Sequence, residues 1–377
     1  MTTKNLKISR LFFLGLTLTA SVMATAGCMG KNGFLGQDKK SGKAEAISAT
    51  SPLASSAATV AHNKQILIGA CGAGANSSVR VQRSDASEGI NIGEAFVGFQ
   101  GGVNVGSVDY NADGIPDILV GAAPSAQPHI RVFDGRDGVG EMASYFGFDQ
   151  PYKGGVNVAG CVLDGKPAIV AGAATEPHVM VFKIIDGKPE EHLSFYAFKN
   201  TDGSPVSGIG ARVTCGDFNG DGKNDIIVGS GPGKNLNGTV KVFDSANGDL
   251  IAEFTPTTDP WYNGLFLAAG NIDGVVGDEI VIGVGAGGTP AVKVIKFHAG
   301  SPNPDTINSF LAFDEAFKGG VSVGTTDFDN DGKDDIIVSA GAGGMSAVKI
   351  FPSIANAIEK SYTGFENYNG ATCVSGI

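Results

Sequence analysis

Three acidic loops of one pattern recur along the chain, and each leads directly into a short apolar segment. Oxygen-bearing side chains stand at positions 1, 3, 5 and 9 of each loop, and glycine stands at position 6. The loops begin at residues 109, 217 and 327, so two units of about 54 or 55 residues separate one loop from the next, and such a period is typical of repeat architectures. The twelve side chains are Asp109, Asn111, Asp113, Asp117, Asp217, Asn219, Asp221, Asp225, Asp327, Asp329, Asp331 and Asp335.

This spacing of oxygens suits a hard cation. Ca²⁺ takes six to eight oxygen ligands, and a glycine at the sixth position allows the tight turn that the loop needs. An EF-hand would carry glutamate at position 12, where these loops have Val120, Val228 and Val338, and helices rather than β-branched runs would flank it. An ordinary turn rich in Asp and Asn is the alternative without metal. We expect about three Ca²⁺ sites with a structural role.

Strand patterns repeat around these loops. A second-strand pattern of the type Ile-Leu-Val-Gly begins at residues 66, 118, 169, 226, 280 and 336, whereas the first-strand pattern begins at residues 102, 155, 210, 265 and 320 and then only in the odd tail 370–377. In a ring, this tail supplies the first strand that the N-terminal strands lack. We therefore predict an all-β fold, a six-bladed β-propeller of four-stranded antiparallel blades, closed by pairing the C-terminal strand with the N-terminal blade. A right-handed solenoid is the alternative, but it needs no complementary incomplete ends.

The acidic loops and the run Ile-Leu-Val-Gly-Ala-Ala-Pro at 118–124 resemble the FG-GAP or VCBS-type repeats of integrin α N-terminal propellers and of many bacterial surface proteins. The resemblance covers residues 62–377 and implies a calcium-binding recognition or adhesion module. Two loops depart from the pattern. The turn at Asp164 is too short for a metal loop, and the loop 271–279 has no oxygen ligand at position 5, which makes it a doubtful site formed by Asn271, Asp273 and Glu279. Integrin propellers also have seven blades, whereas counting gives six here.

The N-terminal segment has the features of an export signal, because basic residues precede the apolar run 11–20 and small residues follow it. Cleavage after Ala26 would suit ordinary signal peptidase. Residues 26–28 instead resemble a bacterial lipobox, although Thr25 stands where that motif usually has leucine; in this interpretation Cys28 is lipidated and anchors the protein to a membrane.

These features predict three parts of the chain. Residues 1–27 form a signal peptide, for which the lipoprotein type is favoured, residues 28–61 form a flexible low-complexity tether rich in Ser, Ala, Gly and Lys, and residues 62–377 form the propeller. The expected location is the cell envelope, as an outer-membrane lipoprotein, and a periplasmic or secreted protein is the alternative.

Composition agrees with an exported all-β protein. The chain has 57 glycines, which is typical of a fold dense in turns, and its net charge of −11 argues against nucleic acid as a partner. Four further cysteines permit two disulfides in three pairings, with four buried free thiols as the alternative. Their positions place one pair in adjacent blades and the other in the two halves of the closing blade. These pairs are Cys161 with Cys215 and Cys71 with Cys373.

The sequence predicts binding rather than catalysis. The histidines do not cluster by spacing, and the Asp residues that could pair as acid and base are better explained as calcium ligands. Aromatic residues in the loops from fourth to first strands lie on the face away from the acidic loops, where they suit a sugar ring or a protein, unless they only cap the ring. These candidate ligand-binding residues are Tyr152, Trp261, Tyr262 and Phe317.

We therefore expect a monomeric recognition or adhesion module for a protein or glycan at a cell surface. The alternative is a carbohydrate-binding, lectin-like propeller or an accessory domain of a polysaccharide-degrading system.

Overall fold

The computed structural model describes residues 65–84, 89–149, 151–298, 303–354 and 356–377. The predicted signal peptide, the tether and Cys28 lie outside these residues. In the described part the chain forms strands, turns and bends without a helix, so none of these residues belongs to a helix long and apolar enough to cross a membrane.

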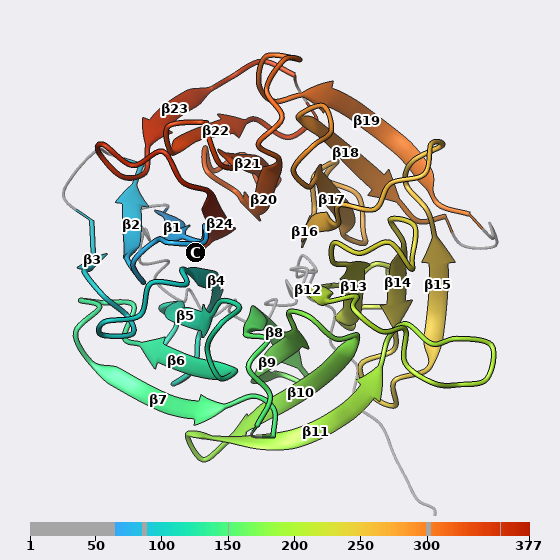
Figure 1. Ribbon diagram of the computed structural model, residues 1–377, viewed down its shortest axis with the longest axis horizontal. Coiled ribbons are helices and arrows are strands. Elements are labelled where there is room, and N and C mark those ends of the chain that lie inside the picture. Colours follow the sequence, from blue (N-terminus) through green and yellow to red (C-terminus); the bar gives the residue numbers. More distant parts are fainter. Residues whose placement is uncertain (1–64, 85–88, 150, 299–302, 355) are drawn as a thin grey trace, which may run out of the picture. The chain divides into compact units, whose positions relative to one another are not determined.

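The strands of the described residues form six four-stranded antiparallel sheets around a common centre (Figure 1). The predicted six-bladed β-propeller is thus confirmed. The closing blade consists of β24 (Thr372–Gly376), β1 (Gln65–Ala70), β2 (Val79–Arg83) and β3 (Asn91–Ile92); blade 1 of β4 (Val103–Val108), β5 (Asp117–Ala122), β6 (His129–Phe133) and β7 (Glu141–Phe146); blade 2 of β8 (Val156–Leu163), β9 (Lys166–Ala173), β10 (His178–Ile185) and β11 (Lys188–Tyr196). Blade 3 consists of β12 (Ala211–Gly216), β13 (Asp225–Ser230), β14 (Val240–Phe243) and β15 (Leu250–Phe254); blade 4 of β16 (Leu265–Gly270), β17 (Glu279–Val284), β18 (Ala291–Lys296) and β19 (Asp305–Leu311); blade 5 of β20 (Val321–Thr326), β21 (Asp335–Ala340), β22 (Ala347–Phe351) and β23 (Lys360–Thr363).

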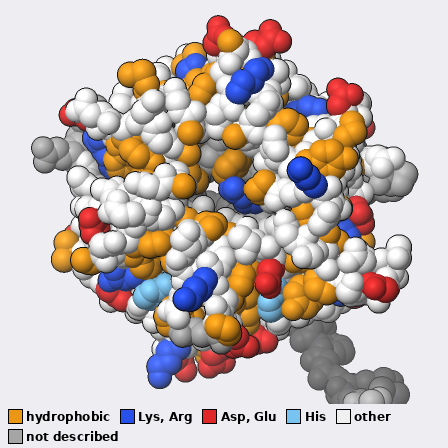
Figure 2. Space-filling model, viewed as in Figure 1, with side chains coloured by type: hydrophobic (Ala, Val, Ile, Leu, Met, Phe, Trp, Pro, Cys, Tyr) orange, Lys and Arg blue, Asp and Glu red, His pale blue; other side chains and the backbone are white. Residues whose placement is uncertain are grey.

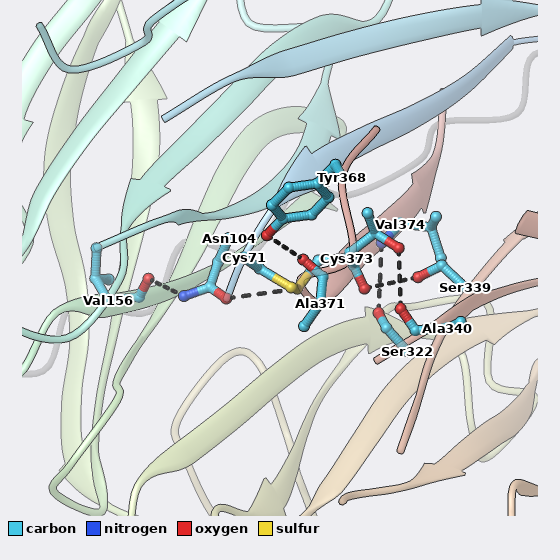
Figure 3. Close-up of a disulfide and its surroundings, with 11 residues drawn as sticks. Cys71, Asn104, Val156, Ser322, Ser339, Ala340, Tyr368, Ala371, Cys373 and Val374 are labelled. Carbon is cyan, nitrogen blue, oxygen red and sulfur yellow. Dashed lines mark hydrogen bonds between the residues drawn. A yellow bond between two sulfur atoms is a disulfide. The ribbon is translucent and has the colours of Figure 1, made fainter. Parts of the chain in front are cut away.

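The ring closes as the incomplete repeats predict. β24 pairs antiparallel with β1, so that Gly69 lies opposite Cys373, and a disulfide joins Cys373 to Cys71 with the Cα atoms 5.8 Å apart (Figure 3). The buried Ser339 hydroxyl of blade 5 donates a hydrogen bond of 2.8 Å to the carbonyl of Thr372. Strands from both ends of the described chain therefore form one blade, and a hydrogen bond joins this blade to blade 5.

A second disulfide joins two other blades. Cys161 in β8 and Cys215 in β12 are bonded with their Cα atoms 5.6 Å apart. Both cysteines lie on the innermost strands of blades 2 and 3, so the bond links neighbouring blades next to the central channel. The structure thus has the two pairings that the cysteine positions favour.

The hydrophobic core lies between blades rather than within them. Each of the six core clusters among the described residues combines side chains of two adjacent blades. In β13, for example, Ile226 and Val228 pack against blade 2, whereas Ile227 packs against blade 4. Because successive side chains of a strand point to opposite faces, the second strand of a blade is buried on both faces and reads as a continuous apolar run.

Glycine stands at the end of this apolar run for a steric reason. A Cβ atom on Gly172 would lie 2.3 Å from the carbonyl oxygen of Ala211 in the next blade. No side chain fits at that distance, so glycine allows the backbones of two blades to approach closely. The recurrent apolar run and its glycine therefore encode blade-to-blade contact.

Candidate functional site

The three complete acidic loops connect the first and second strands of blades 1, 3 and 5. In each loop the residue at position 9 is the first residue of the second strand. These residues, Asp117, Asp225 and Asp335, are at most 3% exposed. Each loop is therefore fixed at one end to the most buried strand of its blade.

Hydrogen bonds within the loops shape them into tight turns. In blade 3 the two carboxylate oxygens of Asp217 accept hydrogen bonds from the backbone N–H groups of Asp221 at 3.0 Å and Gly222 at 2.9 Å. Gly222 has a φ of +83°, which a side chain rarely adopts and which the glycine at position 6 explains. In blade 1, Asp109 makes the same two contacts at 3.0 and 2.9 Å. Short side chains with oxygen atoms thus turn their oxygens toward the inside of the loop.

The loop of blade 5 brings its carboxylates closest together. One oxygen from each of Asp327, Asp329 and Asp335 lies within 4.8 Å of the other two, the one such group of three among the described residues. Backbone N–H groups of Phe328 and Ser353 donate to the two oxygens of Asp335 at 2.8 and 2.9 Å. These contacts hold the position-9 carboxylate in place beside the other two.

The buried carboxylates at position 9 are electrostatically costly when no cation is near. Burial, followed by the charge of Asp221, raises the pKa of Asp225 to about 7, and burial raises the pKa of Asp335 to about 6. Burial also raises the pKa of Asp117. In addition, Oδ2 of Asp225 is buried without a hydrogen-bond partner among the described residues. A donor set of convergent carboxylates with an unpartnered buried oxygen fits a hard divalent cation.

The loop of blade 4 differs in a way that the sequence pattern did not reveal. The ammonium group of Lys296, the last residue of β18, contacts the carboxylate of Asp273 and lies 2.9 Å from Oε1 of Glu279. Glu279 is 1% exposed. A lysine thus supplies positive charge between the acidic groups of the doubtful fourth site.

Blade 2 shows a related arrangement at its shortened turn. Lys183 of β10 lies 2.7 Å from Asp164, the acidic residue that remains there. Lys183 and Lys296 occupy the same position in their blades. Each lysine directly follows the third-strand residue that pairs with the first isoleucine of the second strand, Phe182 opposite Ile169 in blade 2 and Ile295 opposite Ile280 in blade 4. The three blades with complete loops have no lysine at this position, where they carry Asp134, Asp244 and Pro352.

The predicted aromatic residues are placed differently from one another. The indole N–H of Trp261 donates to the carbonyl of Gly264 at 2.8 Å, its backbone N–H donates to Asn237 at 2.6 Å, and its ring covers Gly288, where a Cβ atom would lie 2.6 Å from the ring. Trp261 is half-buried against the core cluster of blades 3 and 4, whereas the side chain of the next residue, Tyr262, is 44% exposed. These contacts favour the interpretation that Trp261 caps the ring.

Tyr152 and Phe317 occupy equivalent places in two other blades. The hydroxyl of Tyr152 lies 3.0 Å from the hydroxyl of Thr175, and its ring contacts Phe148 with a centroid distance of 5.9 Å. Phe317 contacts Phe313 with a centroid distance of 5.5 Å. Both are half-buried. The structure does not bring the four aromatic residues together into one site.

Trp261→Ala is expected to reduce stability. Removing the half-buried ring deletes its contacts with Gly288 and the hydrogen bond to Gly264, and the free energy of unfolding should fall by about 2 kcal/mol. Tyr262→Ala is the matched control and should change it by less than about 0.5 kcal/mol. Urea unfolding followed by circular dichroism measures both. An unchanged midpoint for Trp261→Ala would show that the ring does not contribute to blade contact.

A cavity of about 610 Å³ opens where the loops between second and third strands and those between fourth and first strands surround the central channel. The second residue of each innermost strand contributes to its wall, and loop residues from every blade form the rim. The six wall residues are Asn104, Asn157, Arg212, Phe266, Ser322 and Cys373. Sequence reasoning missed this cavity. The available signal was that this position differs among the repeats, whereas its neighbours in the strand are mostly apolar.

Comparison with known protein families identifies the repeat. The FG-GAP repeat family matches residues 210–243 and 319–352, which hold the acidic loops of blades 3 and 5. Two segments of the propeller thus match the FG-GAP repeat. A search of curated proteins found no match.

Solved structures are similar to this chain at low sequence identity. A protein of unknown function from Bacteroides caccae has a TM-score of 0.51 and 12% identity, with 83% of this chain and 99% of that chain covered. A protein from Lactobacillus plantarum has a TM-score of 0.48 and 10% identity over 83% of this chain and 99% of that one. Sqt1 from Chaetomium thermophilum has a TM-score of 0.41 and 17% identity over 80% and 69%. The similarity to the Bacteroides protein concerns the fold alone.

Proposed function

We propose that this FG-GAP propeller is a recognition module stabilised by calcium. The observation that carries the proposal is the group of Asp327, Asp329 and Asp335, whose oxygens converge within 4.8 Å. The loops of blades 1 and 3 repeat the same spacing of oxygens with asparagine at position 3. FG-GAP propellers commonly serve as binding modules, so the metal is assigned a structural role and the rest of the ring a binding role.

The proposed metal ions would stabilise the point where each blade turns from its first to its second strand. The twelve ligand positions carry ten carboxylates, which repel one another when no cation is near. Residues of positions 1, 3, 5 and 9 would bind Ca²⁺ through their oxygens, and the ion would supply the positive charge that the buried position-9 carboxylates lack. Three sites are proposed, in blades 1, 3 and 5.

The remaining functional assignments extend this proposal. The protein is proposed to act by binding and not by catalysis, because the acidic residues that could serve as acid and base are assigned to the metal loops. Anchoring to the cell envelope through Cys28 belongs to the same proposal and rests on the sequence before the described residues. A protein or a glycan at a cell surface is the proposed class of partner.

Calcium binding should raise the stability of the protein. Extracellular calcium-binding modules typically have a Kd of roughly 10⁻⁴ to 10⁻³ M, and a tenfold excess of Ca²⁺ over Kd adds about 1.4 kcal/mol per site. Thermal unfolding with Ca²⁺ and with a chelator measures the difference, and calorimetric titration gives the number of sites, for which we expect three. An unchanged melting temperature in chelator would overturn the assignment of the loops.

Two variants sharpen this test. Asp329→Ala should remove one site and leave two, because it deletes one of the three convergent carboxylates in blade 5. Asp273→Asn in blade 4 is the matched control and should leave three, since Lys296 already contacts this carboxylate. A fourth calcium site in the unmodified protein would contradict the role given to Lys296.

A further inference from the structure

The mouth of the central channel contains a positive charge without a negative partner. Among the described residues the guanidinium group of Arg212 has no hydrogen bond or ion pair, and its one specific contact is with the ring of Phe266, 4.0 Å from the guanidinium carbon to the ring centroid. None of the described residues that line the cavity is an aspartate or a glutamate. Arg212 is half-buried, and a contact with an aromatic face uses none of the N–H donors of arginine. These donors therefore remain available for an anion.

The cavity concentrates this charge in a protein that is otherwise acidic. The chain has a net charge of −11, and its acidic loops lie at the turns between first and second strands, whereas the cavity opens among the other set of loops. Figure 2 shows one end of the ring, where apolar and uncharged side chains surround a central hollow with Lys or Arg atoms at its edge. Burial lowers the pKa of Arg212 to about 10, so the group stays charged at neutral pH.

The polar groups beside Arg212 are oriented by the neighbouring blades. The amide nitrogen of Asn104 donates to the carbonyl of Val156 at 2.9 Å (Figure 3). The amide nitrogen of Asn157 donates to the carbonyl of Ala211 at 2.7 Å. These hydrogen bonds engage one N–H of each amide group and hold the group in place, and its carbonyl oxygen can accept a hydrogen bond from a hydroxyl group. The hydroxyl of Ser322 adds a group that can donate or accept.

We propose that this cavity binds a small carboxylate that also carries hydroxyl groups, which is the chemistry of a sugar acid. Arg212 pairs with the carboxylate, and the amide oxygens of Asn104 and Asn157 accept from hydroxyls of the ligand. One arginine matches one negative charge, and its planar fork fits a carboxylate in two-point contact. A cavity of about 610 Å³ lies in the usual range for small-molecule sites. The proposal rests on the recognition role and gives it a ligand class.

The test measures binding of D-glucuronate by ligand-observed NMR and by calorimetry on the calcium-loaded protein. Glucose, which lacks the carboxylate, and benzoate, which lacks the hydroxyls, are the comparison ligands. Glucuronate should bind at least tenfold more tightly than either one, because each comparison ligand leaves polar groups of the cavity unpaired. Equal binding of glucuronate and glucose would overturn the role of Arg212, and equal binding of glucuronate and benzoate would overturn the role of the asparagines.

Variants separate this site from the calcium loops. Arg212→Gln should weaken glucuronate binding at least tenfold, and Arg212→Lys should restore part of it because the charge returns. Arg80→Gln, which removes a positive charge outside the cavity, should bind like the unmodified protein. The number of bound calcium ions should stay the same in all three variants, so failure of the cavity and failure of the metal sites give different results. Unchanged glucuronate binding by a folded Arg212→Gln variant would overturn the proposal.

Discussion

Deleting residues 366–377 is expected to abolish cooperative folding of the ring. The deletion removes β24, which pairs with five residues of β1, from Ile66 to Ala70. It also removes Cys373, and with it the disulfide to Cys71. The buried residues of β1 would then form an open sheet edge with apolar faces, which pairs readily with other chains. We expect aggregation, or a broad unfolding transition in place of a cooperative one, measured by size-exclusion chromatography and by calorimetry.

A point variant separates the covalent from the noncovalent part of closure. Cys373→Ser removes the disulfide but leaves β24 in place, and loss of a native disulfide typically costs about 2–4 kcal/mol. This variant should remain monomeric and unfold cooperatively at a lower temperature. If the deletion and Cys373→Ser had the same modest effect, strand pairing at the closure would contribute little, and the ring would be held mainly by the disulfide.

The architecture could be predicted from the sequence because the same packing constraints act in every blade. The second strand lies between two neighbouring blades, so Ile226 and Ile227 must both be apolar although they face opposite ways. Gly172 must lack a side chain because the next backbone is too close. These constraints recur in most blades and produce a pattern that can be counted. The count of first strands then predicted the closure formed by β24 and β1.

The candidate sites could be predicted only where their residues lie close together in the sequence. The acidic loops are continuous in sequence, so their ligand positions can be read directly. Lys296 lies in the third strand, and its contact with Glu279 in the second depends on the register between these strands. The cavity combines Arg212 and Phe266 with residues from the other blades, which only the closed ring brings together. Trp261 has rigid prolines before it in sequence, but the glycines that receive its ring come from other loops.

Protein stripped of calcium is expected to be more stable at pH 5 than at pH 7.5. Burial raises the pKa of Asp225 to about 7 and of Asp335 to about 6, above the ordinary value of 3.8 that applies to the unfolded chain. The folded state therefore holds protons more tightly, and its stability is highest below the ordinary pKa and falls as the pH rises from about 4 through 7. Each pKa unit corresponds to about 1.4 kcal/mol, so the melting temperature should change by several degrees, measured by thermal unfolding after dialysis.

Calcium and one variant test the cause of this pH dependence. Bound Ca²⁺ favours the charged carboxylates, so the calcium-loaded protein should lose the decline between pH 5 and 7.5 and should release calcium on acidification. The Asp225→Asn variant has no titratable group at this position. The stability of its metal-free form should therefore decline less with rising pH than that of the unmodified protein, although the variant binds one calcium ion fewer. General charge repulsion in an acidic protein would affect the variant and the unmodified protein almost equally. Parallel pH profiles for the two would therefore assign the decline to net charge and not to the buried loop carboxylates.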